Sequence, residues 1–146
     1  MSLQRTFAII KPDAVEAGHV DDIIEMIEDH GFDIIAGEEI DLDKAQAQQF
    51  YAVHKDRPFY GELVSYMTSG PVVLLVLEKE NAVEDWRKLM GATDPKKAEA
   101  GTVRALYGTD ISKNATHGSD SAENAAIEIE QFFPDLDEEF DDEDFE

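Results

Sequence analysis

The chain has 146 residues and no cysteine, which gives enough length for one domain with a buried core and excludes disulfides, thiolate metal sites and cysteine nucleophiles. Its 34 acidic residues outnumber the 12 lysines and arginines, and the resulting net charge of −22 repels the phosphates of DNA and RNA, so we expect no nucleic-acid partner. The longest apolar run, residues 72–77, is too short to span a bilayer and the first residues lack a signal-peptide pattern, so we expect a cytoplasmic protein with no membrane partner.

Hydrophobic periodicity and turn residues predict the secondary structure. Strands are predicted at residues 7–10, 32–40 and 72–77, and helices at residues 20–30, 43–51, 58–67, 81–91 and 121–132. Gly31 is typical of a residue that ends a helix. Two possible capping boxes mark helix starts, Asp43 with Gln46 and Asn81 with Glu84. The boundaries therefore rest on cap residues as well as on periodicity.

The order of these elements predicts the fold class. Strands and helices alternate, with a pair of helices before the central strand and a further strand before the last helix, which is typical of an α+β fold with a ferredoxin-like antiparallel sheet covered by helices. Residues 91–113 show little periodicity and contain three glycines and a proline. An irregular segment of this length in a compact domain is usually a binding or active-site loop, so we predict a long active-site loop here.

The acidic residues concentrate at the end of the chain but are not confined to it. Residues 135–146 carry nine acids and no base, and the remaining residues still carry 25 acids against 12 bases, a charge of −13. We predict a folded domain at residues 1–134 and a disordered acidic tail at residues 135–146. Either the tail keeps the protein in solution or the whole surface is adapted to high salt, and the spread of the acids favours the second hypothesis.

Residues 114–121 read Asn-Ala-Thr-His-Gly-Ser-Asp-Ser and place one histidine, His117, before the last helix. A neutral imidazole is a competent nucleophile near pH 7 because its unperturbed pKa lies at about 6.5. Gly118 lets the backbone turn closely behind the ring, and the polar residues that follow can cap the helix. Taken alone, the motif fits a histidine in a strand-to-helix turn better than a catalytic residue.

The few arginines of this acidic chain are Arg5, Arg57, Arg87 and Arg104. Arg87 is predicted on the helix before the long loop, Arg104 lies in the loop, Thr93 stands between them, and Lys11 ends the first strand. If the fold brings these residues together, they form a cationic cluster suited to binding phosphate. Otherwise the arginines pair with the abundant carboxylates. Together with His117 they indicate phosphoryl transfer through a histidine, in which cations offset the charge on the transferred group.

The octapeptide at residues 114–121 resembles the active-site signature of nucleoside diphosphate kinases. Five further segments resemble the same family in the same order: residues 6–14 (TFAIIKPDA), 57–60 (RPFY), 69–73 (SGPVV), 90–95 (MGATDP) and 101–104 (GTVR). The resemblance runs from about residue 6 to residue 133, and so many ordered matches are highly specific. It implies a nucleoside diphosphate kinase domain over residues 1–134.

This resemblance implies a ping-pong mechanism. The γ-phosphate of a nucleoside triphosphate such as ATP passes to a nucleoside diphosphate through a phosphohistidine at His117, and Mg²⁺ arrives with the nucleotide, held mainly by phosphates and water. The partners are then nucleoside di- and triphosphates. The residues that the resemblance places around the nucleotide are Lys11, Tyr51, His54, Arg87, Thr93, Arg104 and Asn114.

The resemblance also implies individual roles. The residues expected to contact phosphates are His54, Arg87, Thr93 and Arg104, and those expected to reach the ribose and phosphate are Lys11 and Asn114. Phe59 would stack on the base with Ile111 on its other face, an arrangement that tolerates any base. Ser119 and Glu128 would support the histidine. Considered singly, Tyr51 and Phe59 also fit core aromatics, Glu128 a solvated acid, His54 a surface histidine and Trp86 a packing residue.

Two features depart from the family pattern. Thr116 stands where the family usually has a bulkier residue, and the acidity is unusual. Because family members form tetramers or hexamers from a common dimer, we expect a homo-oligomer, with interfaces weakened by charge repulsion at low salt.

Three other functions compete with the kinase function. A catalytically inactive nucleotide-binding module conflicts with the intact His117 and phosphate-site residues. A nucleic-acid-binding ferredoxin-like domain needs exposed aromatics on its central strands, and residues 72–77 have none. An interaction protein that acts through its acidic tail would lose its function, but not phosphotransfer, when residues 135–146 are deleted.

Overall fold

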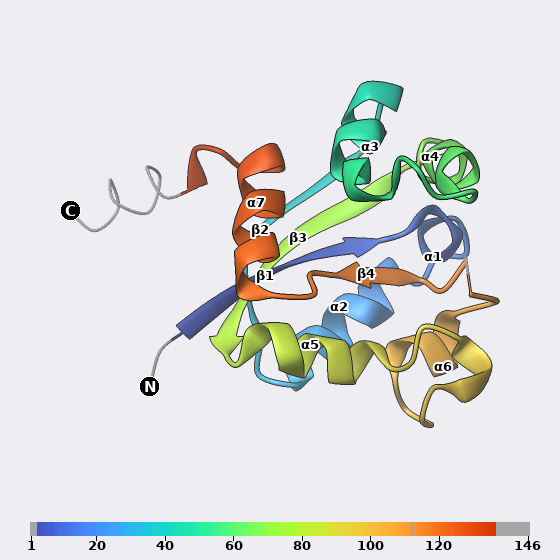
Figure 1. Cartoon of the computed structure of the whole chain (residues 1–146). Helices are drawn as coiled ribbons and strands as arrows, with labels where there is room; N and C mark the ends of the chain where they lie inside the picture. The colour runs from blue at the N-terminus through green and yellow to red at the C-terminus, as the bar shows by residue number, and fades with distance from the viewer. Residues whose placement is uncertain (1–2, 112, 137–146) are drawn as a thin grey trace.

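The computed structural model describes residues 3–111 and 113–136. At its centre lies one antiparallel sheet with the strand order β2-β3-β1-β4, and helices cover both faces (Figure 1). The strands are β1 (Leu3–Ile10), β2 (Asp33–Ile40), β3 (Val72–Glu80) and β4 (Thr116–Gly118). The helices are α1 (Pro12–Glu16), α2 (Val20–Asp29), α3 (Lys44–Phe50), α4 (Tyr60–Met67), α5 (Ala82–Met90), α6 (Val103–Tyr107) and α7 (Ala122–Phe132), with 3-10 turns η1 (Ala52–His54) and η2 (Pro95–Lys97). This is the sheet covered by helices that the sequence predicts.

The two central strands are apolar on both faces because each face packs against its own set of helices. Ala8 and Ile10 of β1 join a core that includes residues of α1, α2, α5 and α6. Phe7 and Ile9 point to the other side and join a core with residues of α3, α4 and α7. Alternate residues of β1 are thus buried in two different cores, which explains why residues 7–10 form an uninterrupted apolar run.

The register of the sheet determines the position of His117. β1 pairs with β3 from Leu3 opposite Glu80 to Ile10 opposite Val73. On its other side β1 pairs with only three residues of β4, and His117 lies opposite Ile9. The histidine therefore sits at the edge of the sheet on a strand attached to a fully buried neighbour.

Cap residues fix several helix starts. The Asp43–Gln46 capping box is confirmed, since the Asp43 side chain accepts from the Gln46 backbone N–H (2.7 Å) and the Gln46 side chain accepts from the Asp43 backbone N–H (3.0 Å). Ser121 caps α7 by accepting from the Asn124 backbone N–H (3.1 Å).

The predicted box of Asn81 with Glu84 is wrong. Asn81 adopts a left-handed conformation (φ 58°) and its side chain makes no capping hydrogen bond. The N–H of Val83 is satisfied by Gln4 of β1 instead, whose side-chain oxygen accepts it at 2.9 Å. Tertiary structure therefore caps α5, the helix that carries Trp86 and Arg87.

The segment predicted as a long irregular loop, residues 91–113, contains η2 and the short helix α6. Asp94 caps η2 and Thr102 caps α6 through side-chain oxygens that accept backbone N–H groups (3.0 and 3.4 Å). Each element is a single short turn, too brief to show helical periodicity, so the sequence pattern does not reveal it. Helix α1 was missed for the same reason.

The C-terminal end of the described chain packs on the sheet. Leu136 is only 5% exposed and belongs to the core that holds α7. Residues 137–146, most of the predicted acidic tail, lie outside the described residues, so the boundary at residue 134 and the disorder of the tail remain predictions.

The cap from Gln4 yields a stability prediction. Replacing Gln4 by alanine leaves the partly buried Val83 N–H without its acceptor, so we expect the free energy of unfolding to fall by about 0.5–2 kcal/mol. Asn81→Gly is the matched variant at the expected cap, where glycine adopts the left-handed conformation without strain, and it should not destabilise the protein. Urea unfolding measures both. A larger loss for Asn81→Gly than for Gln4→Ala would contradict the assignment of the cap.

Candidate active site

His117 is fixed through one ring nitrogen. It lies on β4, its side chain is 22% exposed, and its Nε2 is 3.2 Å from Oε1 of Glu128 on α7. A carboxylate can only accept a hydrogen bond, so Nε2 carries the proton and Nδ1 keeps its lone pair. The pair therefore sets the tautomer that leaves Nδ1 as the nucleophilic nitrogen.

Glu128 is itself held by Ser119. The Ser119 hydroxyl is fully buried and donates to Oε1 of Glu128 at 2.8 Å. Oγ of Ser119 also accepts the backbone N–H of Phe7 at 3.2 Å. The imidazole is thus connected through Glu128 and Ser119 to the central strand β1. The supporting role of Ser119 and Glu128 in catalysis stays a prediction.

Aromatic packing holds β4 from the side of α5 and α3. Trp86 is completely buried and its Nε1 donates to the backbone oxygen of His117 at 3.2 Å. A Cβ at Gly118 would lie 2.6 Å from Met90 and 2.7 Å from Trp86, so only glycine allows this close approach. Phe50 of α3 contacts the imidazole with its ring at 74°, centroids 5.0 Å apart. The ring of His117 is therefore confined as well as hydrogen-bonded.

Lys11 and Asn114 form a buried polar pair beside β4. Lys11 donates from Nζ to Oδ1 of Asn114 at 2.8 Å. Burial, and next the charge of Arg104, lower the pKa of Lys11 to about 8. The Asn114 amide donates in turn to the backbone oxygens of Thr93 and Ile111, both at 3.0 Å. Asn114 thus ties the loop segments on either side of α6 to Lys11.

Arg104 braces the same region from α6. Its Nη1 donates to the oxygen of Gly91 and its Nη2 to the oxygen of Thr116, both at 3.0 Å. Burial, and next the charge of Arg87, lower the pKa of Arg104 to about 10. Its Nε is buried and has no hydrogen-bond partner among the residues that the structure describes. A buried donor without a partner is unfavourable until an acceptor arrives.

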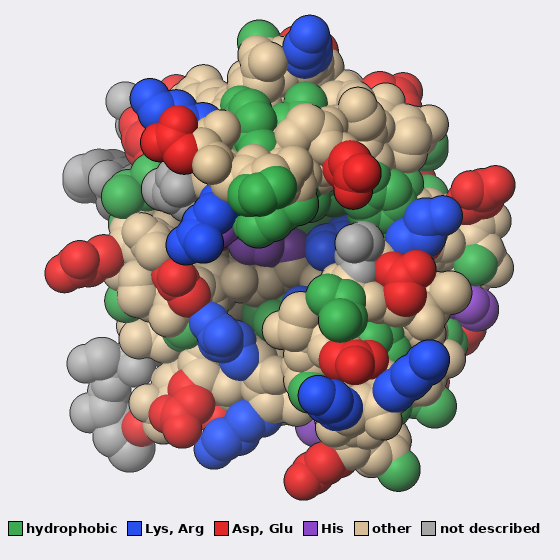
Figure 2. All heavy atoms as spheres, turned by 45° about the vertical axis from the view of Figure 1, so that its right-hand side comes forward, with side chains coloured by type: hydrophobic (Ala, Val, Ile, Leu, Met, Phe, Trp, Pro, Cys, Tyr) green, Lys and Arg blue, Asp and Glu red, His purple; other side chains and the backbone are tan. Residues whose placement is uncertain are grey.

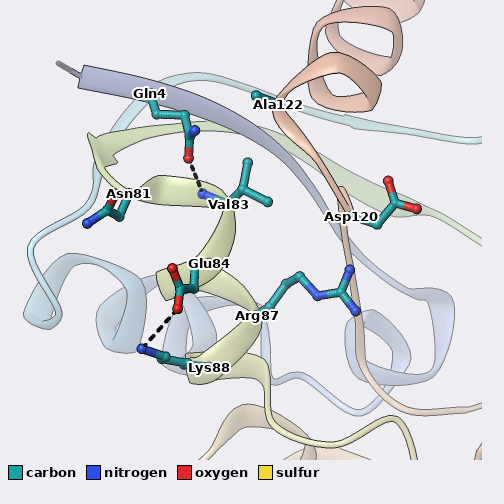
Figure 3. A pocket seen from close by; sticks show the side chains of 8 residues that line it. All are labelled: Gln4, Asn81, Val83, Glu84, Arg87, Lys88, Asp120 and Ala122. Atoms are coloured by element: carbon teal, nitrogen blue, oxygen red, sulfur yellow. Dashed lines mark hydrogen bonds and ion pairs between the residues drawn. The ribbon is translucent and has the colours of Figure 1, made fainter.

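Arg87 is exposed on α5 and lines a pocket of about 550 Å³ that also includes Gln4 and Asp120. Figure 3 shows the Arg87 side chain extending from α5 toward the segment that carries Asp120, while Lys88 on the outer side pairs with Glu84. This pocket shares Asp120 with the cleft that contains His117. The pocket beside Arg87 therefore adjoins the cleft of His117 at Asp120.

The cleft that contains His117 has a volume of about 1060 Å³ and lies between α3, η1 and α7. Tyr51, His54 and Glu128 also line it. The Tyr51 hydroxyl is buried and has no hydrogen-bond partner within residues 3–111 and 113–136. Burial, and next the charge of Glu128, raise its pKa, so it stays protonated as a donor. Figure 2 shows a histidine at the floor of a hollow with Lys and Arg side chains gathered around it.

The two residues predicted to hold the base are exposed. Phe59 is 47% exposed and Ile111 is 60% exposed. The Phe59 ring contacts that of His54, with centroids 5.6 Å apart. Large apolar side chains exposed beside a cleft are typical of a binding surface rather than of a core, which argues against reading Phe59 as a core aromatic.

Comparison with known proteins gives the family. The family model described as "Nucleoside diphosphate kinase" matches residues 4–138, nearly the whole chain. The chain belongs to the nucleoside diphosphate kinase family.

Individual relatives agree with this assignment. The nucleoside diphosphate kinase of Anaeromyxobacter sp. strain K is 59% identical over 93% of this chain and 92% of that protein. Among solved structures, the Aquifex aeolicus nucleoside diphosphate kinase superposes with a TM-score of 0.88 at 43% identity, covering 90% of this chain and 96% of that one. A halophilic nucleoside diphosphate kinase from Halobacterium salinarum, solved in complex with CDP, gives 0.86 at 41% identity, covering 90% and 88%. These neighbours confirm the predicted α+β fold.

The kinase fold brings most of the predicted site residues into two linked groups. One group surrounds the imidazole and contains His117, Glu128, Ser119, Tyr51 and His54. The other lies at the ends of β1, α5 and α6 and contains Lys11, Asn114, Thr93, Arg104 and Arg87. Phe59 and Ile111 adjoin these groups with exposed side chains: the Phe59 ring contacts His54 of the first, and the backbone oxygen of Ile111 accepts from Asn114 of the second.

Some residues with a place in the site were not predicted. Phe50 contacts the imidazole, and Trp86 hydrogen-bonds the His117 backbone. Asp13 accepts a hydrogen bond from the turn before β4, and Tyr66 donates to Asp13. Asp13 lies inside the family-like segment at residues 6–14, which was a usable signal. No local pattern marks Phe50 or Tyr66, because their roles depend on which elements pack together.

Residues 3–111 and 113–136 contain neither a membrane-spanning helix nor a cluster of metal ligands. None of the helices there is long and apolar enough to cross a membrane. The same residues contain no group of three or more His, Asp or Glu side chains arranged to hold a metal ion.

The lowered pKa of Lys11 predicts a pH dependence of stability. Between pH 8 and 10.5 the unfolded chain binds a proton at Lys11 that the folded protein has released, so this residue makes the free energy of unfolding rise with pH in that window. We expect the rise to disappear in Lys11→Met. Urea unfolding at several pH values measures it, and Lys44→Met, which removes an exposed lysine, controls for the lost charge. Parallel pH profiles for the wild type and Lys11→Met would contradict the buried, deprotonating Lys11.

Proposed function

We propose that His117 is the residue that carries the phosphoryl group in this nucleoside diphosphate kinase. Phosphotransfer through a phosphohistidine is the general mechanism of the family. The observation that carries the proposal is the Nε2–Glu128 hydrogen bond, which leaves the lone pair on Nδ1. Nδ1 attacks the γ-phosphorus of a nucleoside triphosphate, the bond to the bridging oxygen breaks, and the nucleoside diphosphate leaves with that oxygen. A terminal phosphate oxygen of a second nucleoside diphosphate then attacks the phosphohistidine and releases the imidazole.

Lys11, Arg87 and Arg104 are positively charged, which supports their role in phosphate binding. Thr93 and His54 are proposed to contact the same phosphates. Charge spreads over the oxygens of the transferred group in the transition state, and fixed cations stabilise it. The Nε of Arg104 and the hydroxyl of Tyr51 are buried donors without acceptors, which a phosphate oxygen would satisfy. Asn114, held by Lys11, would reach the ribose.

Phe59 and Ile111 are proposed to hold the base between them. Their exposure leaves apolar surface available, and stacking without hydrogen bonds to the base edges accepts all bases. The Halobacterium salinarum relative was solved with CDP, and nucleoside di- and triphosphates are the corresponding partners here. Mg²⁺ is proposed to arrive with the nucleotide, bound by phosphates and water.

The assembly and setting of the enzyme are also proposals. We infer a homo-oligomer, a tetramer or hexamer built from a dimer, from the family resemblance. In the described sheet β2 pairs only with β3, so its other edge is open for a second chain. We also propose a cytoplasmic location and adaptation of the acidic surface to high salt.

Labelling tests the nucleophile. Incubation with Mg²⁺ and ATP labelled in its γ-phosphate should give an acid-labile, alkali-stable label that GDP removes. His117→Ala should take up no label. His30→Ala is the matched control, because His30 is exposed and bonds only to its own helix in the described structure.

A label that persists in His117→Ala would disprove the assignment. The same experiment at low and high salt tests the acidic surface, since label that forms only at high salt would support the proposed adaptation and equal label at both would oppose it.

Glu128 tests the tautomer. Glu128→Gln removes the negative charge that fixes the proton on Nε2 while keeping the shape of the side chain. Loss of a charge-assisted hydrogen bond should slow phosphorylation of His117 by roughly ten- to a hundredfold. Rapid-quench measurement of the first turnover checks this, with Glu130→Gln, an exposed acid on the same helix, as control. Equal rates in both variants would show that Glu128 does not set the nucleophile.

A further inference from the structure

The backbone immediately before the catalytic strand makes an unusually tight turn. The N–H of Thr116 donates to the oxygen of Asn114 at 2.9 Å, two residues back, and Ala115 at the centre has φ 75°. A three-residue turn with positive φ is rare and strained for any residue with a Cβ. Such strain persists only where the surrounding structure imposes it, and it occurs most often at functional sites.

Two hydrogen bonds impose this conformation on Ala115. Its backbone oxygen accepts the N–H of Lys11 at 2.8 Å. In regular antiparallel pairing the N–H of Ala115 would donate to the backbone at the end of β1. It donates to Oδ2 of Asp13 at 3.2 Å instead. The side chain of Asp13 therefore holds the donor group that the strained turn takes away from regular strand pairing.

Asp13 is in turn held by Tyr66, which lies on α4, 53 residues further along the chain. The Tyr66 hydroxyl donates to Oδ1 of Asp13 and accepts the backbone N–H of Asp13, the latter at 3.2 Å. The two carboxylate oxygens thus have separate tasks, one toward Tyr66 and one toward Ala115. This fixes the orientation of the carboxylate plane.

The turn connects two parts of the proposed site. Before it stands Asn114, which accepts from Lys11. After it stands Thr116, whose oxygen accepts from Arg104, followed directly by His117. A change in the backbone at Ala115 would therefore move the Lys11–Asn114 pair relative to the imidazole.

We propose that Tyr66 is a positioning residue for phosphoryl transfer: through Asp13 it holds the strained turn at Ala115, which sets the Lys11–Asn114 pair against His117. The inference rests on the proposed role of His117. Because α4 begins directly after Phe59, the proposed base contact, one helix connects the base end of the site with its phosphate end.

Tyr66→Phe is the first test. It removes the hydroxyl and keeps the ring, so we expect the rate of His117 phosphorylation to fall by roughly ten- to a hundredfold, the range for losing a hydrogen bond to a charged group. The KM for ATP should change by less than about twofold, because no proposed ligand of the nucleotide is removed. Tyr60→Phe is the matched control on the same helix, since its hydroxyl donates only to the oxygen of Gln48, at 3.4 Å, among the contacts described. It should keep the wild-type rate.

A rescue experiment separates positioning from general stability. In Tyr66→Phe combined with Ala115→Gly, glycine adopts the positive φ without the hydrogen bond from Asp13. We expect the double variant to phosphorylate His117 at least threefold faster than Tyr66→Phe does. Its thermal stability should not exceed that of Tyr66→Phe. Asp13→Asn gives an independent route if Tyr66→Phe folds poorly: it places an amide against the Ala115 N–H, and the same glycine should rescue it.

The outcomes divide clearly. A Tyr66→Phe rate equal to that of Tyr60→Phe, or a loss that glycine at position 115 does not reduce in either background, would overturn the inference. Absence of label on the wild-type protein would instead overturn the proposed role of His117, so the two failures are distinguishable.

Discussion

The pairing of β4 with β1 is the interaction on which the rest of the site depends. Only three residues of β4 join the sheet, and a strand this short has little stability of its own. Side chains from other elements supply the missing contacts: Trp86 holds the oxygen of His117 and Arg104 holds the oxygen of Thr116. The nucleophile is therefore placed by hydrogen bonds from α5 and α6 to a strand anchored on a buried neighbour. This explains why Gly118 is needed, since a side chain there would separate β4 from Trp86.

The charges of the site oppose those of the molecule. Burial, and next the charge of Arg104, lower the pKa of Lys11, and burial, and next the charge of Arg87, lower that of Arg104, although the whole chain carries a net charge of −22. Repulsion among these cations is unfavourable in the free protein, and a bound polyphosphate would relieve it by offsetting their charges.

The sequence predicted the elements with clear periodicity and the residues within recognisable motifs. The capping box at Asp43 was correct because both partners lie within one turn, whereas the one at Asn81 failed because Gln4, far away in sequence, supplies the cap. Likewise His117, Ser119 and Glu128 could be proposed from the family resemblance, since the first two lie in the octapeptide and Glu128 lies in the helix that follows it. Phe50, Trp86 and Tyr66 could not, since their contacts with the site arise only when separate helices pack on the two faces of the sheet.

This difference arises because contacts from other elements stabilise the backbone conformation of the site. A motif specifies which side chains are present, but the strained φ of Ala115 cannot be maintained by residues 114–121 alone. It needs the N–H of Lys11 and the carboxylate of Asp13, and that carboxylate needs Tyr66 of α4, 53 residues further along the chain. Alanine at this position therefore makes the geometry of the octapeptide conditional on the hydrogen bonds between Tyr66 of α4 and Asp13 of α1. The catalytic segment acquires its shape only in the complete fold, which couples the helix that follows Phe59 to the strand that carries His117.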